Sequence, residues 1–169
     1  MEYPERKHVR LPFWDYRQAG AYAVTICSAD RACVFGSIRE GRMELTKLGG
    51  LVEAAWREIP QHYSNVELDV HAVMPNHFHG ILLILDGPIL RHDADVERNF
   101  GNIQAKSRSS IIRAFKAGVT RDVGKTIWQS GFHEHIIRDE EDLWNHKLYI
   151  DNNPAQWEFD RENPDFVGP

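Results

Sequence analysis

The sequence predicts a single α+β domain built on an antiparallel sheet, and three observations support this. The 169 residues suit one domain of ordinary size. The composition is 42% hydrophobic and 27% charged, enough to bury a core and keep a polar surface. Segments with the period of a strand alternate with segments that have the period of an amphipathic helix. Together these observations exclude a disordered chain, a collagen-like fibre and a coiled coil.

Targeting to a membrane or to the outside of the cell is not expected. The longest aliphatic run, Ile81–Leu85, has five residues, whereas a bilayer span needs about 20. The first ten residues lack the apolar region of a secretory signal. Two cysteines, Cys27 and Cys33, form neither a disulfide framework nor a four-ligand zinc site. We therefore expect a cytoplasmic protein with reduced thiols and no membrane partner.

The first third of the chain is expected to form a strand, a hairpin and a helix. β-Branched and aromatic residues predict a strand at 22–27. Residues 33–38 and 42–45 flank a Glu-Gly turn and predict a hairpin. Thr46 is placed to cap a helix whose apolar residues recur at i, i+3, i+4 and i+7. Pro60 is expected to end that helix.

Two strands and a long connection are expected next. Residues 68–74 alternate between apolar and polar, which predicts a half-buried strand. Residues 77–85 become apolar on both faces, which favours a central strand of the sheet. Residues 86–102 are polar without a clear period, and we expect a mobile loop there.

The last third of the chain predicts helix, strand and helix. Ser107 or Ser109 caps the first helix, and a strand is expected over 127–138. Asp139 caps the final helix, whose first turn is acidic. The residues of this helix expected to face the core are Trp144 and Leu148. Without the hairpin and the last helix the order is βαββαβ, the ferredoxin-like plan with an antiparallel sheet.

The sharpest chemical feature is the run Asn76-His77-Phe78-His79-Gly80. Residues i and i+2 of a strand point to the same face, so His77 and His79 project together while Phe78 enters the other face. Two imidazoles in this arrangement can hold one divalent metal. The alternative is a pair of ordinary polar residues at a sheet edge.

A second pair, His133 and His135, lies on a predicted strand with Glu134 between the two residues. Histidines in such a position are commonly hydrogen-bonded or exposed, and that is the plainer interpretation here. Metal ligation is the alternative.

Tyr149 and Asn153 are four residues apart on the predicted last helix and so share a face. A phenol can act as a nucleophile that forms a covalent intermediate, and an amide oxygen can complete a metal shell. Packing is the alternative role for Tyr149. Pro154 disfavours helical geometry at Asn153, which weakens the spacing argument.

Charge is sorted along the chain although the net charge is −5. Residues 106–125 hold six Lys or Arg and one acid, whereas residues 139–169 hold nine acids and two bases. A local basic surface for nucleic acid is therefore compatible with the composition, and a solvated helix face is the alternative. The candidate backbone contacts are Arg10, Lys106, Arg108, Arg113, Lys116 and Arg121.

The order of these motifs resembles the single-tyrosine HUH transposases, in particular the REP-associated tyrosine transposase branch. The stretches that carry the resemblance span most of the chain. They are RLPFWDY at 10–16 with GAYAVTIC at 20–27, VMPNHFHG at 73–80, Trp128-Gln129 with EHIIR at 134–138, and YIDNNP at 149–154.

The resemblance implies a role for each matching residue. His77 and His79 correspond to the HUH pair that binds the metal, Mg²⁺ or Mn²⁺. Tyr149 corresponds to the nucleophile, and Asn153 to a third metal ligand. The implied reaction is cleavage and rejoining of single-stranded or hairpin DNA through a 5′-phosphotyrosine, by a monomer or a homodimer. The loop at 86–102 has no match, and the acidic segment at 155–169 is unusual for a DNA enzyme.

Under the resemblance, residues 1–169 form a single transposase-like domain that includes an N-terminal segment at 1–19. Two rival functions remain at this point. One rival is a binding module of the same fold that binds nucleic acid without cutting it. The other is a small zinc hydrolase that uses the histidine pairs with Glu134.

Overall fold

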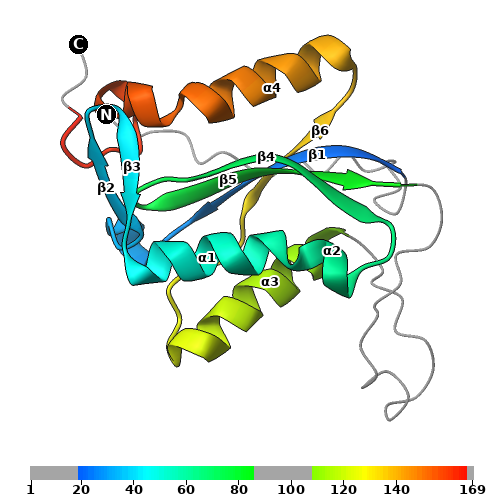
Figure 1. Cartoon of the computed structure of the whole chain (residues 1–169), viewed down its shortest axis with the longest axis horizontal. Coiled ribbons are helices and arrows are strands. Elements are labelled where there is room, and N and C mark those ends of the chain that lie inside the picture. The colour runs from blue at the N-terminus through cyan, green and yellow to red at the C-terminus, as the bar shows by residue number, and fades with distance from the viewer. Residues whose placement is uncertain (1–18, 86–107, 167–169) are drawn as a thin grey trace.

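The computed structural model describes residues 19–85 and 108–166, in which helices lie on both faces of a central sheet (Figure 1). In chain order the elements are β1 (Gly20–Cys27), a 3₁₀ turn (Ala29–Arg31), β2 (Gly36–Arg39), β3 (Arg42–Leu45), α1 (Lys47–Arg57), α2 (Ile59–His62), β4 (Val66–Val73), β5 (His77–Ile84), α3 (Arg108–Val123), β6 (His133–Ile137), α4 (Glu140–Asn152) and a 3₁₀ helix (Pro154–Phe159).

The sheet has the strand order β4-β5-β1-β6, and every neighbouring pair is antiparallel. With the separate hairpin β2-β3, the short helix α2 and helix α4 set aside, β1, α1, β4, β5, α3 and β6 follow the βαββαβ order. The predicted ferredoxin-like plan is therefore confirmed. Strands β5 and β1 occupy the centre of the sheet, which explains why β5 is apolar over most of its length.

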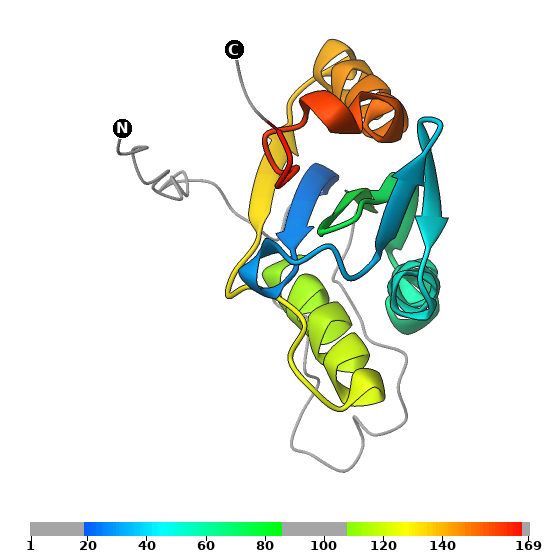
Figure 2. The same cartoon turned by 90° about the vertical axis from the view of Figure 1, so that its left-hand side faces the viewer.

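The main core lies between the sheet and helices α1 and α3, whereas α4 covers the opposite face (Figures 1 and 2). The Trp56 ring of α1 meets Phe78 of β5 at a centroid distance of 4.6 Å and Phe115 of α3 at 5.5 Å. The inner face of α3 is buried and consists of Ile111, Ile112, Phe115 and Val119. A smaller cluster lies under α4 and includes Ala23, Ile81 and Ile150.

The helix boundaries follow the local chemistry, with one correction. Thr46 caps α1 as predicted, because its side chain accepts a hydrogen bond from the Gly49 amide at 3.1 Å. Pro60 does not end α1, which stops at Arg57. Pro60 lies in the first turn of α2 instead. A proline fits there because the first amides of a helix have no intrahelical acceptor.

The last strand is shorter than the predicted 127–138, since β6 covers only His133–Ile137. Ile127 and Trp128 are buried outside any regular strand, and Trp128 forms a single bridge with Ser28. Their apolar side chains pack in the main core.

The prediction for the face of α4 is wrong. Trp144 is 61% exposed and Leu148 is 42% exposed. The inner face instead presents Leu143 and Ile150 to the cluster below the helix, and Lys147 forms a 2.7 Å ion pair with Asp69 of β4. Both stripes have helical spacing, so periodicity alone could not choose between them.

None of the helices within the described ranges is both long and apolar enough to cross a bilayer. The loop predicted at 86–102 lies outside the described residues.

Gly80, the last residue of the NHFHG run, is explained by packing. A Cβ atom at this position would lie 2.5 Å from Cζ2 of Trp56, which is fully buried. We expect Gly80→Ala to lower the free energy of unfolding by about 1–3 kcal/mol, the usual effect of overpacking a core. Urea unfolding measures the change. In the control Gly118→Ala, in α3, the new methyl meets nothing within 4 Å, so this variant should be neutral or stabilised. Equal losses in both variants would contradict the packing explanation.

Candidate metal and tyrosine site

The alternation of β5 sends its two histidines to the sheet face that α4 covers. Phe78 packs on the opposite face, in the main core. The rings of His77 and His79 lie 4.5 Å apart, centroid to centroid, at an angle of 76°. The two histidines therefore project together as expected. The alternative of polar residues at a sheet edge fails, because β5 is an inner strand and its histidines are only 0% and 7% exposed.

Asn76 determines which nitrogen of His77 is available. The Asn76 amide nitrogen donates to the backbone carbonyls of Arg31 at 3.1 Å and Glu162 at 2.7 Å. Its oxygen must therefore be the atom 2.9 Å from Nδ1 of His77, and Nδ1 donates to it. The lone pair of His77 is then on Nε2, which is buried without a hydrogen-bond partner among the described residues.

Thr25 of β1 contacts Nδ1 of His79, as Asn76 contacts Nδ1 of His77. The two residues are opposite each other in the β1–β5 register, and Oγ1 of Thr25 lies 2.8 Å from Nδ1 of His79. Nε2 of His79 is also buried, and no described group forms a hydrogen bond with it. Each histidine is thus held through Nδ1 and leaves Nε2 unpartnered, as in metal-bound histidines oriented by an outer partner.

Burial keeps both imidazoles neutral. It lowers the pKa of His77 to about 4, with a smaller contribution from the Arg31 guanidinium. It lowers the pKa of His79 to about 3, and the adjacent His77 adds to the effect. Near neutral pH both imidazoles are therefore uncharged, which is the form that ligates a metal. Nε2 of His77 carries the lone pair because Nδ1 donates to Asn76, and Nε2 of His79 does so when Nδ1 donates to Thr25.

Asn153 contributes a third unpartnered atom. Its side chain is 4% exposed, and Oδ1 is buried with no hydrogen-bond partner in the described part of the chain. The concern about Pro154 is not realised, because Asn153 keeps helical dihedrals of φ −56° and ψ −43° at the end of α4. Tyr149 and Asn153 therefore remain one helical turn apart on a common face.

Tyr149 lies against the histidine pair. Its ring centroid is 5.3 Å from that of His79 in an edge-to-face arrangement, and the residue is 50% exposed. Burial is the main cause that raises the pKa of the phenol, and the Asp160 carboxylate raises it further. Hydrogen bonding with Asn153 lowers this pKa by a smaller amount. The phenol is thus neutral at neutral pH, and half of it is open to solvent.

The C-terminal segment adds residues that sequence reasoning missed. Oδ2 of Asp160 lies 4.0 Å from Nε2 of His77, and the Trp157 ring lies 6.0 Å from that of His77. The acidic segment predicted at 155–169 is therefore packed on the site, at least through Glu162, whose carbonyl accepts from Asn76. An acid-rich composition gave no signal for this contact, since it arises from the path of the chain after α4.

The arrangement has the donor atoms of a divalent-metal site. Two imidazole nitrogens and one amide oxygen are buried without partners, which is costly unless something else satisfies them. The carboxylate of Asp160 adds a negative charge beside them. The residues present therefore fit the metal that the resemblance implies.

The two histidines of the second pair, His133 and His135, have different surroundings. His135 of β6 contacts Asp142 and His146 of α4, whereas His133 is outside that group. Glu134 is opposite Val24, a residue of the main core, so it points to the other face of the sheet. The zinc-hydrolase alternative required Glu134 beside the histidines, and this geometry does not provide it.

The predicted DNA contacts fall into three groups. Arg10 and Lys106 lie outside the described residues, and Arg108 begins α3 without a described side chain. Arg113 and Arg121 are exposed on α3. Lys116 differs from these two, because its ammonium donates to the carbonyls of Gln129 and Gly131, each at 2.7 Å.

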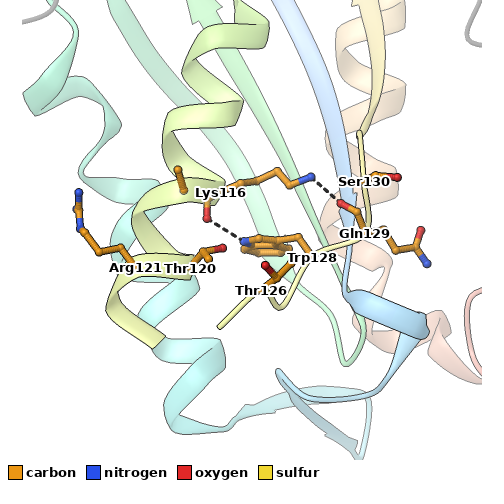
Figure 3. Close-up of a pocket in the computed structure, with 8 residues that line it drawn as sticks. Lys116, Thr120, Arg121, Thr126, Trp128, Gln129 and Ser130 are labelled. Atoms are coloured by element: carbon orange, nitrogen blue, oxygen red, sulfur yellow. Dashed lines mark hydrogen bonds between the residues drawn. The ribbon is translucent and has the colours of Figure 1, made fainter. Parts of the chain in front are cut away.

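Lys116 lines an open pocket of about 500 Å³ together with Arg121 and Trp128 (Figure 3). The Trp128 indole donates to the Lys116 carbonyl at 3.2 Å, and the Lys116 ammonium donates to the Gln129 carbonyl. Each of the two segments, α3 and the stretch before β6, thus donates a hydrogen bond to the other. In this structure the Lys116 ammonium therefore binds the backbone of the segment before β6. DNA binding by this residue stays a prediction.

Comparison with known proteins places the chain among relatives of similar length. No family model matches it. A protein of Haemophilus influenzae described as uncharacterized is 37% identical over 165 residues, which cover 92% of each chain. A second protein of that organism, provisionally named as a REP-associated tyrosine transposase, is 26% identical over 145 residues, covering 84% of this chain and 74% of its own.

The fold also has a solved counterpart. The structure of a REP-associated tyrosine transposase bound to a REP hairpin superposes with a TM-score of 0.60 at 23% identity, covering 86% of this chain and 73% of the other. This likeness concerns the fold, and the named relative carries the same family name. The chain therefore resembles a REP-associated tyrosine transposase in its sequence and in its fold.

Proposed function

We propose that this protein cleaves and rejoins single-stranded DNA with Tyr149 as the nucleophile, at a site where His77, His79 and Asn153 hold a divalent metal. One observation carries the proposal. Three potential ligand atoms of these residues are buried and unpartnered, and the Tyr149 ring packs against His79. The solved relative is described as bound to a REP hairpin, which supports hairpin DNA as the substrate class.

The proposed reaction is a transesterification. The Tyr149 oxygen attacks a backbone phosphorus, forms a 5′-phosphotyrosine and releases a 3′-hydroxyl. Rejoining is the reverse, in which a 3′-hydroxyl attacks the adduct and frees the phenol. The covalent link retains the energy of the broken ester bond, so ATP is not required. The phenol proton must leave during attack, and the raised pKa of Tyr149 makes this proton transfer a demanding part of the step.

A bound Mn²⁺ or Mg²⁺ would polarise the scissile phosphate and offset the charge that develops on it. Imidazole ligands favour Mn²⁺ over Mg²⁺, which prefers oxygen. The residues around the ligands serve to orient them: Asn76 holds His77 and Thr25 holds His79. Trp157 and Asp160, from the segment that follows α4, lie beside His77.

The direct test is incubation of the protein with end-labelled hairpin DNA and Mn²⁺, followed by denaturing electrophoresis. The proposal predicts a labelled species that migrates with the protein and resists denaturation. Binding without any such species would support the non-catalytic module instead.

We expect Asn153→Ala to weaken the metal site in a way that added metal relieves. Loss of the Asn153 oxygen leaves two histidines, so the Mn²⁺ concentration for half-maximal cleavage should rise by about tenfold or more. Cleavage is titrated against Mn²⁺ for the wild type, for Asn153→Ala and for the control Asn152→Ala, an exposed neighbour. A role limited to the helix end would shift thermal stability without moving the titration curve, and superimposed curves would remove Asn153 from the site.

Replacing Arg113 and Arg121 together by Ala is expected to weaken binding of single-stranded DNA at all sequences. Both residues are exposed on α3, where they can contact phosphates. The slope of log affinity against log salt should flatten by about 0.7 for each phosphate that the variant no longer neutralises. The matched control is Arg39→Ala on β2, a side chain that is 74% exposed. If the double variant and the control have the same slope, the DNA does not follow α3.

A further inference from the structure

A second group of potential metal ligands lies outside the proposed catalytic site. It consists of His135 on β6 with Asp142 and His146 on α4, and we call it the His135–Asp142–His146 cluster. Their nearest ligand atoms all lie within 4.8 Å of one another. The three side chains come from two consecutive elements, because β6 leads directly into α4 (Figure 2).

The carboxylate of Asp142 lies between the two imidazoles. Its oxygens are 2.9 Å and 3.0 Å from Nε2 of His135, and Oδ1 is 3.1 Å from Nδ1 of His146. The two rings are stacked with centroids 4.4 Å apart and an angle of 18°. Hydrogen bonding from His135 lowers the pKa of Asp142, so the carboxylate is ionised near neutral pH.

Two imidazole nitrogens and one carboxylate oxygen form a common ligand set for Zn²⁺. Donor atoms around one tetrahedral zinc are separated by about 3.3 Å, given bond lengths of about 2.0 Å. The His135–Asp142 and His146–Asp142 separations are already close to this value. Nδ1 of His146 also lies 2.9 Å from the Asp142 backbone carbonyl, so metal binding would require this ring to exchange that contact for the ion. Mg²⁺ fits poorly because it favours oxygen ligands.

The cluster is distinct from the His77–His79 pair. His135 is opposite Ala23 of β1, and Ala23 is opposite Ile81 of β5, so strand β1 separates the two groups. His135 nevertheless lies on the sheet face that α4 covers. Its neighbour Ala23 packs on that face, in the small hydrophobic core that contains Ile150 of α4. His146 lies three residues before Tyr149 on that helix.

We propose that the His135–Asp142–His146 cluster is a second metal site, which binds Zn²⁺ or a similar transition-metal ion and fastens the first half of the tyrosine helix to β6. The ion replaces the hydrogen bonds that now join the three side chains. The remaining coordination position or positions are open toward solvent, since the His135 side chain is 46% exposed. This inference does not depend on the proposed DNA chemistry.

The test is zinc binding by metal-free protein, measured by calorimetry and by the absorption of Co²⁺ as a spectroscopic substitute. His135→Asn and His146→Asn should each weaken binding at this site by at least about tenfold, a loss that even an outer partner of a ligand can cause. Each should also remove the tetrahedral Co²⁺ bands. The control His133→Asn, which is two residues away on the same strand and outside the cluster, should leave both signals unchanged.

A thermal readout guards against variants that fold poorly. Zn²⁺ should raise the melting temperature of the wild type and of His133→Asn but not that of His146→Asn. His79→Ala separates this inference from the proposed function, because it should lose metal at the catalytic site and keep one zinc equivalent here. If zinc stoichiometry, Co²⁺ bands and zinc-dependent melting are the same in His135→Asn, His146→Asn and the wild type, the cluster is a hydrogen-bonded network and not a metal site.

Discussion

Tyr149→Phe is expected to abolish DNA cleavage and the covalent adduct while the fold and DNA affinity persist. Only the phenol oxygen can form the phosphotyrosine, whereas the ring can still pack against His79 at its present 5.3 Å. Removal of a nucleophile typically costs on the order of 10⁴-fold or more in rate. The hydroxyl belongs to a half-exposed residue, so stability should change by less than about 1 kcal/mol.

Single-turnover cleavage of labelled hairpin DNA measures the rate, and a denaturing gel measures the adduct. The matched control is Trp144→Phe, since Trp144 is an exposed aromatic residue on the same helix, 61% accessible to solvent. This variant should cleave like the wild type. Undiminished cleavage by Tyr149→Phe would mean that another group attacks the phosphate.

His77→Ala and His79→Ala are each expected to reduce metal-dependent cleavage by about 100-fold or more, since each removes a ligand from the proposed metal site. These substitutions are also expected to lower stability. The reason is that both imidazoles are buried. Each truncation leaves a cavity and an unpaired partner, Asn76 or Thr25, so a cost of about 1–3 kcal/mol follows.

Because these variants lose stability, cleavage should be measured well below their melting temperatures and compared with Mn²⁺ affinity from electron paramagnetic resonance. A folded variant with normal Mn²⁺ affinity would contradict the assignment of its histidine. The control His133→Ala lies on the same sheet face, opposite Thr25 on the side away from His79, and should have a smaller effect. The reverse pattern would place the catalytic metal at the second histidine pair.

Local patterns in the sequence were sufficient for most of the fold. The period of two in β5 predicted that His77 and His79 share a face, because side-chain direction in a strand depends only on position. The caps at Thr46 and Asp139 formed as expected, since a side chain and a nearby amide settle them within one turn. The βαββαβ order followed from the succession of these elements.

Where two local patterns competed, the sequence was insufficient. Helix α4 carries two stripes of suitable spacing, and the bulkier one, with Trp144 and Leu148, is exposed. The contact with β4, through Lys147 and Asp69 and through the cluster around Ile150, determines which stripe faces the sheet. Likewise, a His-x-His pattern could not show that His135 turns to α4 while His133 does not.

The sequence by itself supplied the candidate ligands and nucleophile, through strand alternation and helical spacing between nearby residues and through the resemblance of its motifs to a known family. Only the tertiary structure brought Thr25 to His79 and Asp160 to His77. These residues are separated by 54 and 83 positions in the sequence. Contacts over such separations depend on which strands pair and where the chain travels after α4. The geometry that buries the two imidazoles, orients their Nε2 atoms and sets their pKa values therefore comes from packing, which no local pattern records.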